Sequence, residues 1–140
     1  MVYDTGNNVE MDLKNPVIAS IEINLGDGDR QVDFTGTANN PLRDISVTAG
    51  AGNQVVDISV NSPLGVASLD VNLGSGFDIV EDSANTLIID EDLRLTGVNQ
   101  FVHDGVLAVA RDVVVDTRVE VEDSEFTSNG SLLVGATFTY

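Results

Sequence analysis

The strongest constraint on the fold of this chain is a sequence repeat with a period of 24 residues. Three glycine pairs recur at that spacing, Gly26/Gly28, Gly50/Gly52 and Gly74/Gly76. The windows that start at residues 17, 41 and 65 align along their whole length, and a looser copy starts at residue 89. A fixed period of this size is typical of solenoids, in which each repeat forms one unit that stacks on the next.

Within the repeat, apolar and polar residues alternate, as expected for a strand with one buried face. The predicted inward columns are Ile21, Ile45, Leu69 and Leu93; Ile23, Val47, Val71 and Leu95; and Val32, Val56 and Val80. A polar column, Asn24, Thr48, Asn72 and Thr96, runs beside them. If each repeat is one rung, equivalent side chains lie about 4.8 Å apart, the spacing of neighbouring strands. The same period places Arg94 and Arg118 in one column, next to Asp70 on the neighbouring rung.

These patterns predict an all-β protein, a right-handed parallel β-helix (solenoid) with rungs of about 24 residues. Two strands and two turns per repeat also fit an antiparallel β-sandwich or barrel, which remains the alternative. The chain of 140 residues is expected to be a single β-domain. Residues 1–16 would form an N-terminal cap or arm, residues 17–112 the repeat rungs, and residues 113–140 a degenerate rung and a terminal strand.

Charge restricts the partners and the environment. The chain has 23 acidic residues against 6 Lys and Arg, a formal net charge of −17, and no cysteine. Such a surface repels nucleic acid and anionic lipid. No apolar run is long enough to span a membrane, and residues 1–16 lack the features of an export signal. We expect an extracellular or cell-surface setting, where ions screen the repulsion.

The third glycine loop carries a G-x-G-x-D-x-apolar pattern at Gly74, Gly76, Asp78 and Val80. This pattern resembles the glycine-aspartate repeats of RTX calcium β-roll proteins, a group of extracellular proteins with parallel β-helix architecture. The resemblance implies calcium as a ligand at the third loop. In the first two loops the position of Asp78 is occupied by Arg30 and Gln54, so the resemblance does not extend to them.

Carboxylates in the loops supply further candidate ligands for a hard cation, which needs six to eight oxygen atoms. The predicted metal residues are Asp27, Asp29, Gly74, Gly76 and Asp78. An acidic column, Asp33, Asp57 and Glu81, lies just beyond the loops. The alternative is that these acids point into water and the glycines only form turns.

The sequence offers no convincing catalytic group, and we assign no catalytic residue. His103 is the only histidine, which excludes a histidine metal cluster, and it is expected to lie alone at a surface or a corner. Glu120 and Glu122 share one face of a strand and could serve as paired acids, but charge on an outward face is ordinary.

The C-terminal segment alternates Leu132, Val134, Ala136, Phe138 and Tyr140 on one face. We expect either a last strand packed within the domain or an assembly strand in which Leu132, Val134, Phe138 and Tyr140 contact a second copy. The open ends of a solenoid favour self-association for the same reason.

The sequence therefore predicts a non-catalytic extracellular or cell-surface domain, structural or adhesive, stabilised by calcium and self-assembling. The alternative is a carbohydrate-binding or carbohydrate-active β-helix fragment with a surface glycan as its partner.

Overall fold

The computed structural model describes the backbone of residues 2–4, 8–13, 20–36, 42–60, 64–83, 86–116, 118–134 and 138–139. These residues form strands and turns and contain no helix. No helix in the described part of the chain is therefore long and apolar enough to cross a membrane. The strands are β1 (Val2–Asp4), β2 (Asn8–Asp12), β3 (Ser20–Asn24), β4 (Arg30–Gly36), β5 (Leu42–Thr48), β6 (Gln54–Val60), β7 (Leu64–Asn72), β8 (Ile79–Asp82), β9 (Thr86–Ile89), β10 (Leu93–Thr96), β11 (Gln100–Val109), β12 (Val113–Val115), β13 (Arg118–Ser128), β14 (Leu132–Val134) and β15 (Phe138–Thr139).

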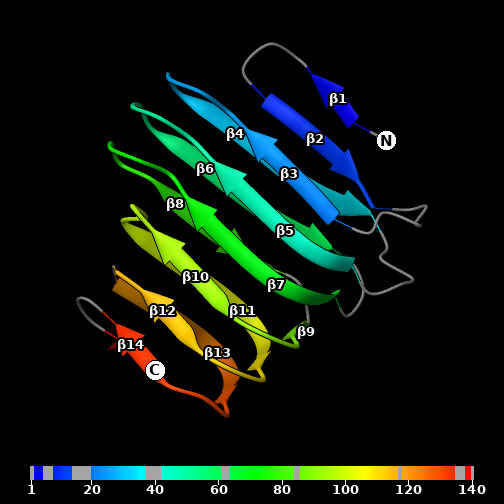
Figure 1. The fold of residues 1–140 in the computed structure, drawn as a ribbon, viewed down its shortest axis with the longest axis vertical. Coiled ribbons are helices and arrows are strands. Elements are labelled where there is room, and N and C mark those ends of the chain that lie inside the picture. The colour runs from blue at the N-terminus through cyan, green and yellow to red at the C-terminus, as the bar shows by residue number, and fades with distance from the viewer. Residues whose placement is uncertain are drawn as a thin grey trace.

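The strands coil into a parallel β-solenoid, which confirms the predicted fold class and rules out the antiparallel alternative. One ladder, here called ladder A, joins β2, β4, β6, β8, β11, β13 and β15 in parallel. A second, ladder C, joins β3, β5, β7, β10, β12 and β14. In Figure 1 the near strands run to the upper left and the far strands return to the lower right while the chain descends, so the coil is right-handed.

A third, shorter ladder B forms where strands continue around a corner. The start of β7 pairs with β9, and β9 pairs with the second half of β11, which in turn pairs with β13. The two halves of β11 are separated by an irregularity next to Gly105, whose φ is +130°. A residue without a side chain allows the strand to bend there and to contribute to two ladders.

The predicted columns are confirmed by the strand register. Ile21 pairs with Ile45, Ile45 with Leu69, and Leu69 with Leu93, and all four side chains are buried. The columns through Val47 and Val56 are likewise continuous and buried, and the polar column through Thr48 is exposed. The interior is therefore a stack of aliphatic layers, with Phe34 and Phe101 as its fully buried aromatic residues in the described part.

The spacing of 24 residues ends after residue 93. In ladder C, Leu93 pairs with Val113 and Val113 with Leu132, so the spacing falls from 24 to 20 and then to 19 residues. Arg94 accordingly pairs with Asp70 and Val114, whereas Arg118 lies in β13 opposite Gln100. The prediction that Arg94 and Arg118 share a column is wrong, because it extended the longer period into the shorter rungs.

The two ends of the chain also differ in detail from a simple stack. At the N-terminal end, β1 pairs with β2 in the antiparallel direction, and the rest of the predicted cap or arm lies outside the described residues. At the C-terminal end, Leu132 and Val134 lie in β14 of ladder C, whereas Phe138 lies in β15 of ladder A. Residues 132–140 therefore do not form one continuous strand, and Tyr140 lies outside the described residues.

Glycine is required in the loops because their backbones stack directly on one another. Gly50 N–H donates to the carbonyl oxygen of Gly26 over 2.8 Å, and Gly28 N–H donates to that of Ala51 over 2.6 Å. A Cβ atom at Gly74 would overlap the carbonyl oxygen of Gly50, and one at Gly76 would overlap that of Gly52. The recurring glycines thus serve close contact between rungs as well as the turn itself.

Two glycines of one column separate the stacking effect from the turn effect. Gly26 has φ +68°, and no atom lies within 4 Å of the place that a Cβ atom would take there. Gly74 has φ +75°, and the Gly50 carbonyl stands in the way of a Cβ atom. We expect Gly26→Ala to lower the free energy of unfolding by about 1–2 kcal/mol, the cost of a left-handed backbone for alanine. Gly74→Ala should cost at least about 2 kcal/mol more, because backbone atoms must separate.

Chemical denaturation of both variants measures this difference. Equal losses of stability in Gly26→Ala and Gly74→Ala would contradict direct stacking of the loops.

Candidate functional site

The outer surface of ladder A carries a continuous acidic column. Asp33 pairs with Asp57 and Asp57 with Glu81, as the sequence predicts, and Glu10 extends the column by one rung. Gln31 Nε2 donates to Asp33 Oδ1 over 2.6 Å, so part of this charge is satisfied within the strand. Neighbouring carboxylates at strand spacing repel one another and favour bound or diffuse cations.

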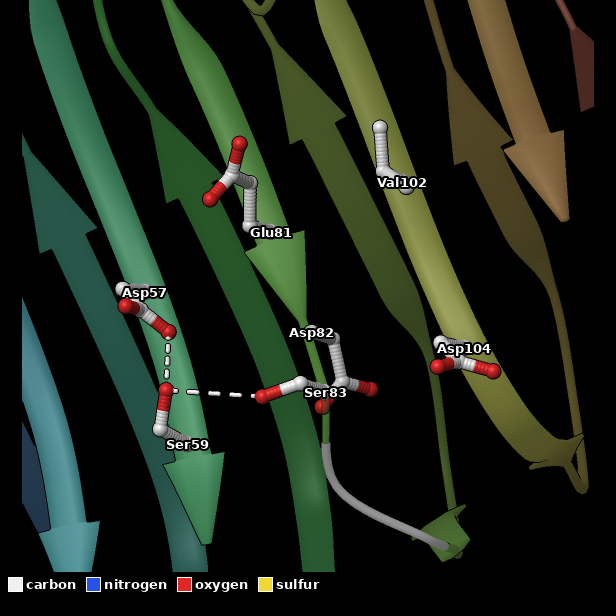
Figure 2. Close-up of a pocket in the computed structure, with 7 residues that line it drawn as sticks. All are labelled: Asp57, Ser59, Glu81, Asp82, Ser83, Val102 and Asp104. Carbon is white, nitrogen blue, oxygen red and sulfur yellow. Dashed lines mark hydrogen bonds between the residues drawn. The ribbon is translucent and has the colours of Figure 1, made fainter. Parts of the chain in front are cut away.

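Beside this column lies a shallow depression of about 220 Å³, shown in Figure 2. It is lined by Asp57, Ser59, Glu81, Asp82, Ser83, Val102 and Asp104. Ser59 Oγ donates to Asp57 Oδ1 over 2.5 Å, and Ser83 Oγ lies 3.4 Å from Ser59 Oγ. We call this depression the acidic groove; its lining offers hydroxyl and carboxylate groups without a basic or aromatic side chain.

The acidic columns continue toward the C-terminus. Glu120 pairs with Val102 and Glu122 pairs with Asp104, so these two acids extend the two outward columns that border the groove. Their backbone positions agree with the prediction that they share one face of a strand. The prediction that they are ordinary outward charges is not tested, because their side chains lie outside the described ones.

His103 is buried, and the prediction of a surface or corner histidine is wrong. Its Nδ1 atom lies 2.6 Å from Asp82 Oδ2, and both side chains are completely buried. His103 pairs in register with Asp82, and Asp82 pairs with Ile58, which places both in an inward column of ladder A. The sequence contained a signal for Asp82, since its repeat position is that of Phe34 and Ile58. His103 escaped because its rung is shorter.

The buried pair contributes to structure and cannot act on a substrate. His103 Nε2 is buried and has no hydrogen-bond partner, so no solvent-borne molecule reaches the nitrogen that a catalytic histidine would use. Loss of either partner would leave the other polar group stranded in the core, which is costly.

The loop side chains bind the backbone of the neighbouring rung. Asp27 Oδ1 accepts from Ala51 N–H and Asp29 Oδ1 from Asn53 N–H, each over 2.9 Å. Asn53 Oδ1 accepts in turn from Phe77 N–H over 3.0 Å. These contacts act as staples between successive loops, because each satisfies a backbone donor of the next rung.

The predicted metal residues do not converge on one site. Asp27 and Asp29 are exposed on the first loop, whereas Gly74, Gly76 and Asp78 belong to the third, two rungs away. Among the described residues, no three acidic or histidine side chains are grouped closely enough to hold a metal ion. Calcium binding stays a prediction.

Asp78 has an unusual environment for a carboxylate. It is completely buried; its Oδ1 accepts from Gln54 N–H over 2.7 Å, and its own N–H donates to Asn99 Oδ1 over 2.7 Å. Asp78 Oδ2 and the Gln54 side-chain oxygen Oε1 are both buried without a hydrogen-bond partner. Burial raises the pKa of Asp78 above its ordinary value of 3.8, and the bond from Gln54 N–H partly opposes that rise.

The predicted assembly residues lie in two ladders. Leu132 and Leu133 are 46% and 63% exposed on β14, Val134 is half-buried, and Phe138 is on β15. Comparisons with protein-family models, with curated proteins and with solved structures gave no match. The site is therefore interpreted from its own geometry.

The environment of Asp78 predicts a pH-dependent contribution to stability. Because its folded-state pKa is raised, the folded chain holds the proton more tightly than the unfolded chain. This contribution is fully present below the unfolded value of 3.8 and is lost as the pH rises through the folded pKa. At neutral pH, Asp78→Asn should raise the free energy of unfolding by about 1–3 kcal/mol, because it removes a buried charge and adds a donor beside Gln54 Oε1.

Denaturation of the wild type and Asp78→Asn from acid to neutral pH measures this effect. Asp27→Asn is the matched control, since Asp27 makes the same kind of bond to a backbone N–H but is exposed. A loss of stability at neutral pH in Asp78→Asn would show that the ionised carboxylate is required.

Proposed function

We propose that this chain is a non-catalytic structural or adhesive domain of an extracellular or cell-surface protein. The observation that carries the proposal is the continuous bonding of each rung to the next. Ladders A, B and C bond the rungs through the backbone, and Asp27, Asp29 and Asn53 bond the loops between the ladders.

This pattern of bonds favours a mechanical role. Tension along the solenoid axis is shared among several parallel strand pairs and the loop staples of the same rung. The interior adds aliphatic layers that resist sliding of one rung against the next, because a shifted register would expose buried residues. A net charge of −17 keeps the exterior hydrated and soluble.

The chemistry of the described side chains also favours binding over catalysis. The one histidine is buried with Asp82, and the acidic groove offers carboxylates and hydroxyls that act as hydrogen-bonding groups. The exterior suits cations, and calcium stabilisation through the stacked carboxylates is part of the proposal. Self-association through β14, where Leu132 and Leu133 are exposed, is another part.

The second candidate is a carbohydrate-binding or carbohydrate-active domain that uses the acidic groove. Ser59, Ser83 and Asp104 could hydrogen-bond to the hydroxyl groups of a surface glycan. The groove lacks an aromatic side chain on which a sugar ring could stack, which weakens this candidate.

A glycan screen combined with turnover assays separates the two candidates. We expect no product from any glycan, and any glycan that binds should be released unchanged, because the lining of the groove functions only in hydrogen bonding. Asp57→Asn and Asp104→Asn would alter binding in the groove, with the outward-facing Glu22→Gln on ladder C as control. Reproducible product release that Asp57→Asn abolishes would contradict the structural role.

Calcium is tested by thermal unfolding in chelator and in millimolar calcium. We expect the melting temperature to rise with calcium, since a ligand that binds only the folded state stabilises it. The double variant Asp57→Asn/Glu81→Gln should reduce the rise if the acidic column binds the cation, and Asp78→Asn should reduce it if the third loop does. An unchanged wild-type melting temperature would remove calcium from the proposal.

A further inference from the structure

The turn between β13 and β14 contains the sequence Ser128-Asn129-Gly130-Ser131, the only Asn-Gly step in the chain. Asn129 and Gly130 are both exposed. Glycine after asparagine leaves the following backbone nitrogen free of steric cover, since no side chain shields it. The step therefore brings a carboxamide carbon and an accessible backbone nitrogen together at the surface.

The hydrogen bonding of this corner differs from that of the rungs before it. Glu91 N–H donates to the carbonyl oxygen of Ala67 over 2.7 Å, and Arg111 N–H donates to that of Glu91 over 3.0 Å. Gly130 occupies the next position, but the Arg111 carbonyl accepts from Ser128 Oγ over 3.2 Å. Within the described part of the chain, Gly130 N–H has no hydrogen bond.

The side chain of Asn129 is also unrestrained, unlike those of other loop asparagines. Asn53 Oδ1 and Asn99 Oδ1 each accept from a backbone N–H of a neighbouring loop, over 3.0 and 2.7 Å. No hydrogen bond from the Asn129 carboxamide is present among the described residues. Both reacting groups of the Asn-Gly step are thus free, while the comparable asparagines are held.

We propose that Asn129 is a site of spontaneous deamidation and isoaspartate formation. The Gly130 backbone nitrogen, losing its proton to water, attacks Cγ of Asn129. The bond from Cγ to the amide nitrogen breaks, ammonia leaves with the proton, and a succinimide ring forms. Water then opens the ring at one of its two carbonyls, which gives either aspartate or isoaspartate.

Isoaspartate would disturb the last described rung of ladder C. It routes the main chain through the side-chain methylene, yet this corner is tight, because even a Cβ atom on Gly130 would overlap the Arg111 carbonyl. On either side, Asn129 N–H bonds to the Val109 carbonyl over 3.2 Å and Ser131 N–H to Asp112 Oδ1 over 2.9 Å. These bonds set the register of β14 on β12, so the longer backbone should loosen β14.

The test ages the purified full chain in mildly alkaline buffer at physiological temperature, next to a free peptide with the sequence TSNGSL. Peptide mapping by mass spectrometry and labelling with an isoaspartyl methyltransferase follow the reaction. We expect the amide-to-acid mass change and the isoaspartate label at Asn129, at a rate comparable to that of the peptide, with Asn53 and Asn99 unchanged. Asn129→Gln should remove the label. An unmodified protein after the peptide has fully reacted would overturn the proposal.

Hydrogen exchange tests the structural consequence. The aged protein should lose protection of the β14 amides, whereas Asn129→Asp, which adds the charge without lengthening the backbone, should keep it. Equal protection in aged and fresh protein would overturn the claim that isoaspartate loosens this rung.

Discussion

Direct stacking of one rung on the next is the constraint on which the rest of this structure depends. Parallel strands satisfy each other's backbone groups only if successive rungs keep the same path, and the glycine loops can follow that path only if nothing projects between them. Gly50, Gly74 and Gly76 meet this condition at positions where a Cβ atom would collide with the loop alongside. Side chains then adapt to a path set by the backbone, with aliphatic residues inside and carboxylates, hydroxyls and amides outside.

Within the described part of the chain, the buried polar side chains Gln54, Asp78, Asp82 and His103 interrupt the aliphatic interior. Asp82 and His103 satisfy each other, whereas Gln54 and Asp78 each leave one oxygen without a donor. Polar groups buried without partners lower stability. The stability of the corner next to the third glycine loop therefore depends on the protonation of Asp78, while the loops around it are held by neutral and exposed bonds.

The architecture could be predicted from the sequence because the repeat carried two signals at the same period. Inward columns such as Ile21, Ile45 and Leu69 and the paired glycines each indicated a spacing of 24 residues. The part of the chain beyond Gly97 was less predictable, since the rungs shorten to 20 and 19 residues and lose the glycine pair. Strand pairing is made by the backbone and tolerates a shorter loop, so nothing in the local pattern announces the change. His103 and Arg118 were misplaced for this reason.

The candidate site was predicted in part. The acidic column Asp33, Asp57 and Glu81 followed from the period, but the groove beside it depends on Asp104, whose register is set by a shorter rung. The loop acids were expected to face water or a cation, whereas Asp27 and Asp29 bond to backbone N–H groups one rung away. Sequence alone could not show this, since the donors lie 24 residues further along the chain.

Disulfide trapping between exposed positions tests the stacking of rungs most directly, because the chain contains no native cysteine. Thr48 and Asn72 are exposed and pair in register, so a Thr48→Cys/Asn72→Cys variant should form an intramolecular disulfide rapidly under mild oxidation. Thr48→Cys/Thr96→Cys places the thiols two rungs apart, about 9–10 Å, and should remain reduced under the same conditions. Equal trapping of both pairs, or trapping of the second alone, would contradict the stacked solenoid.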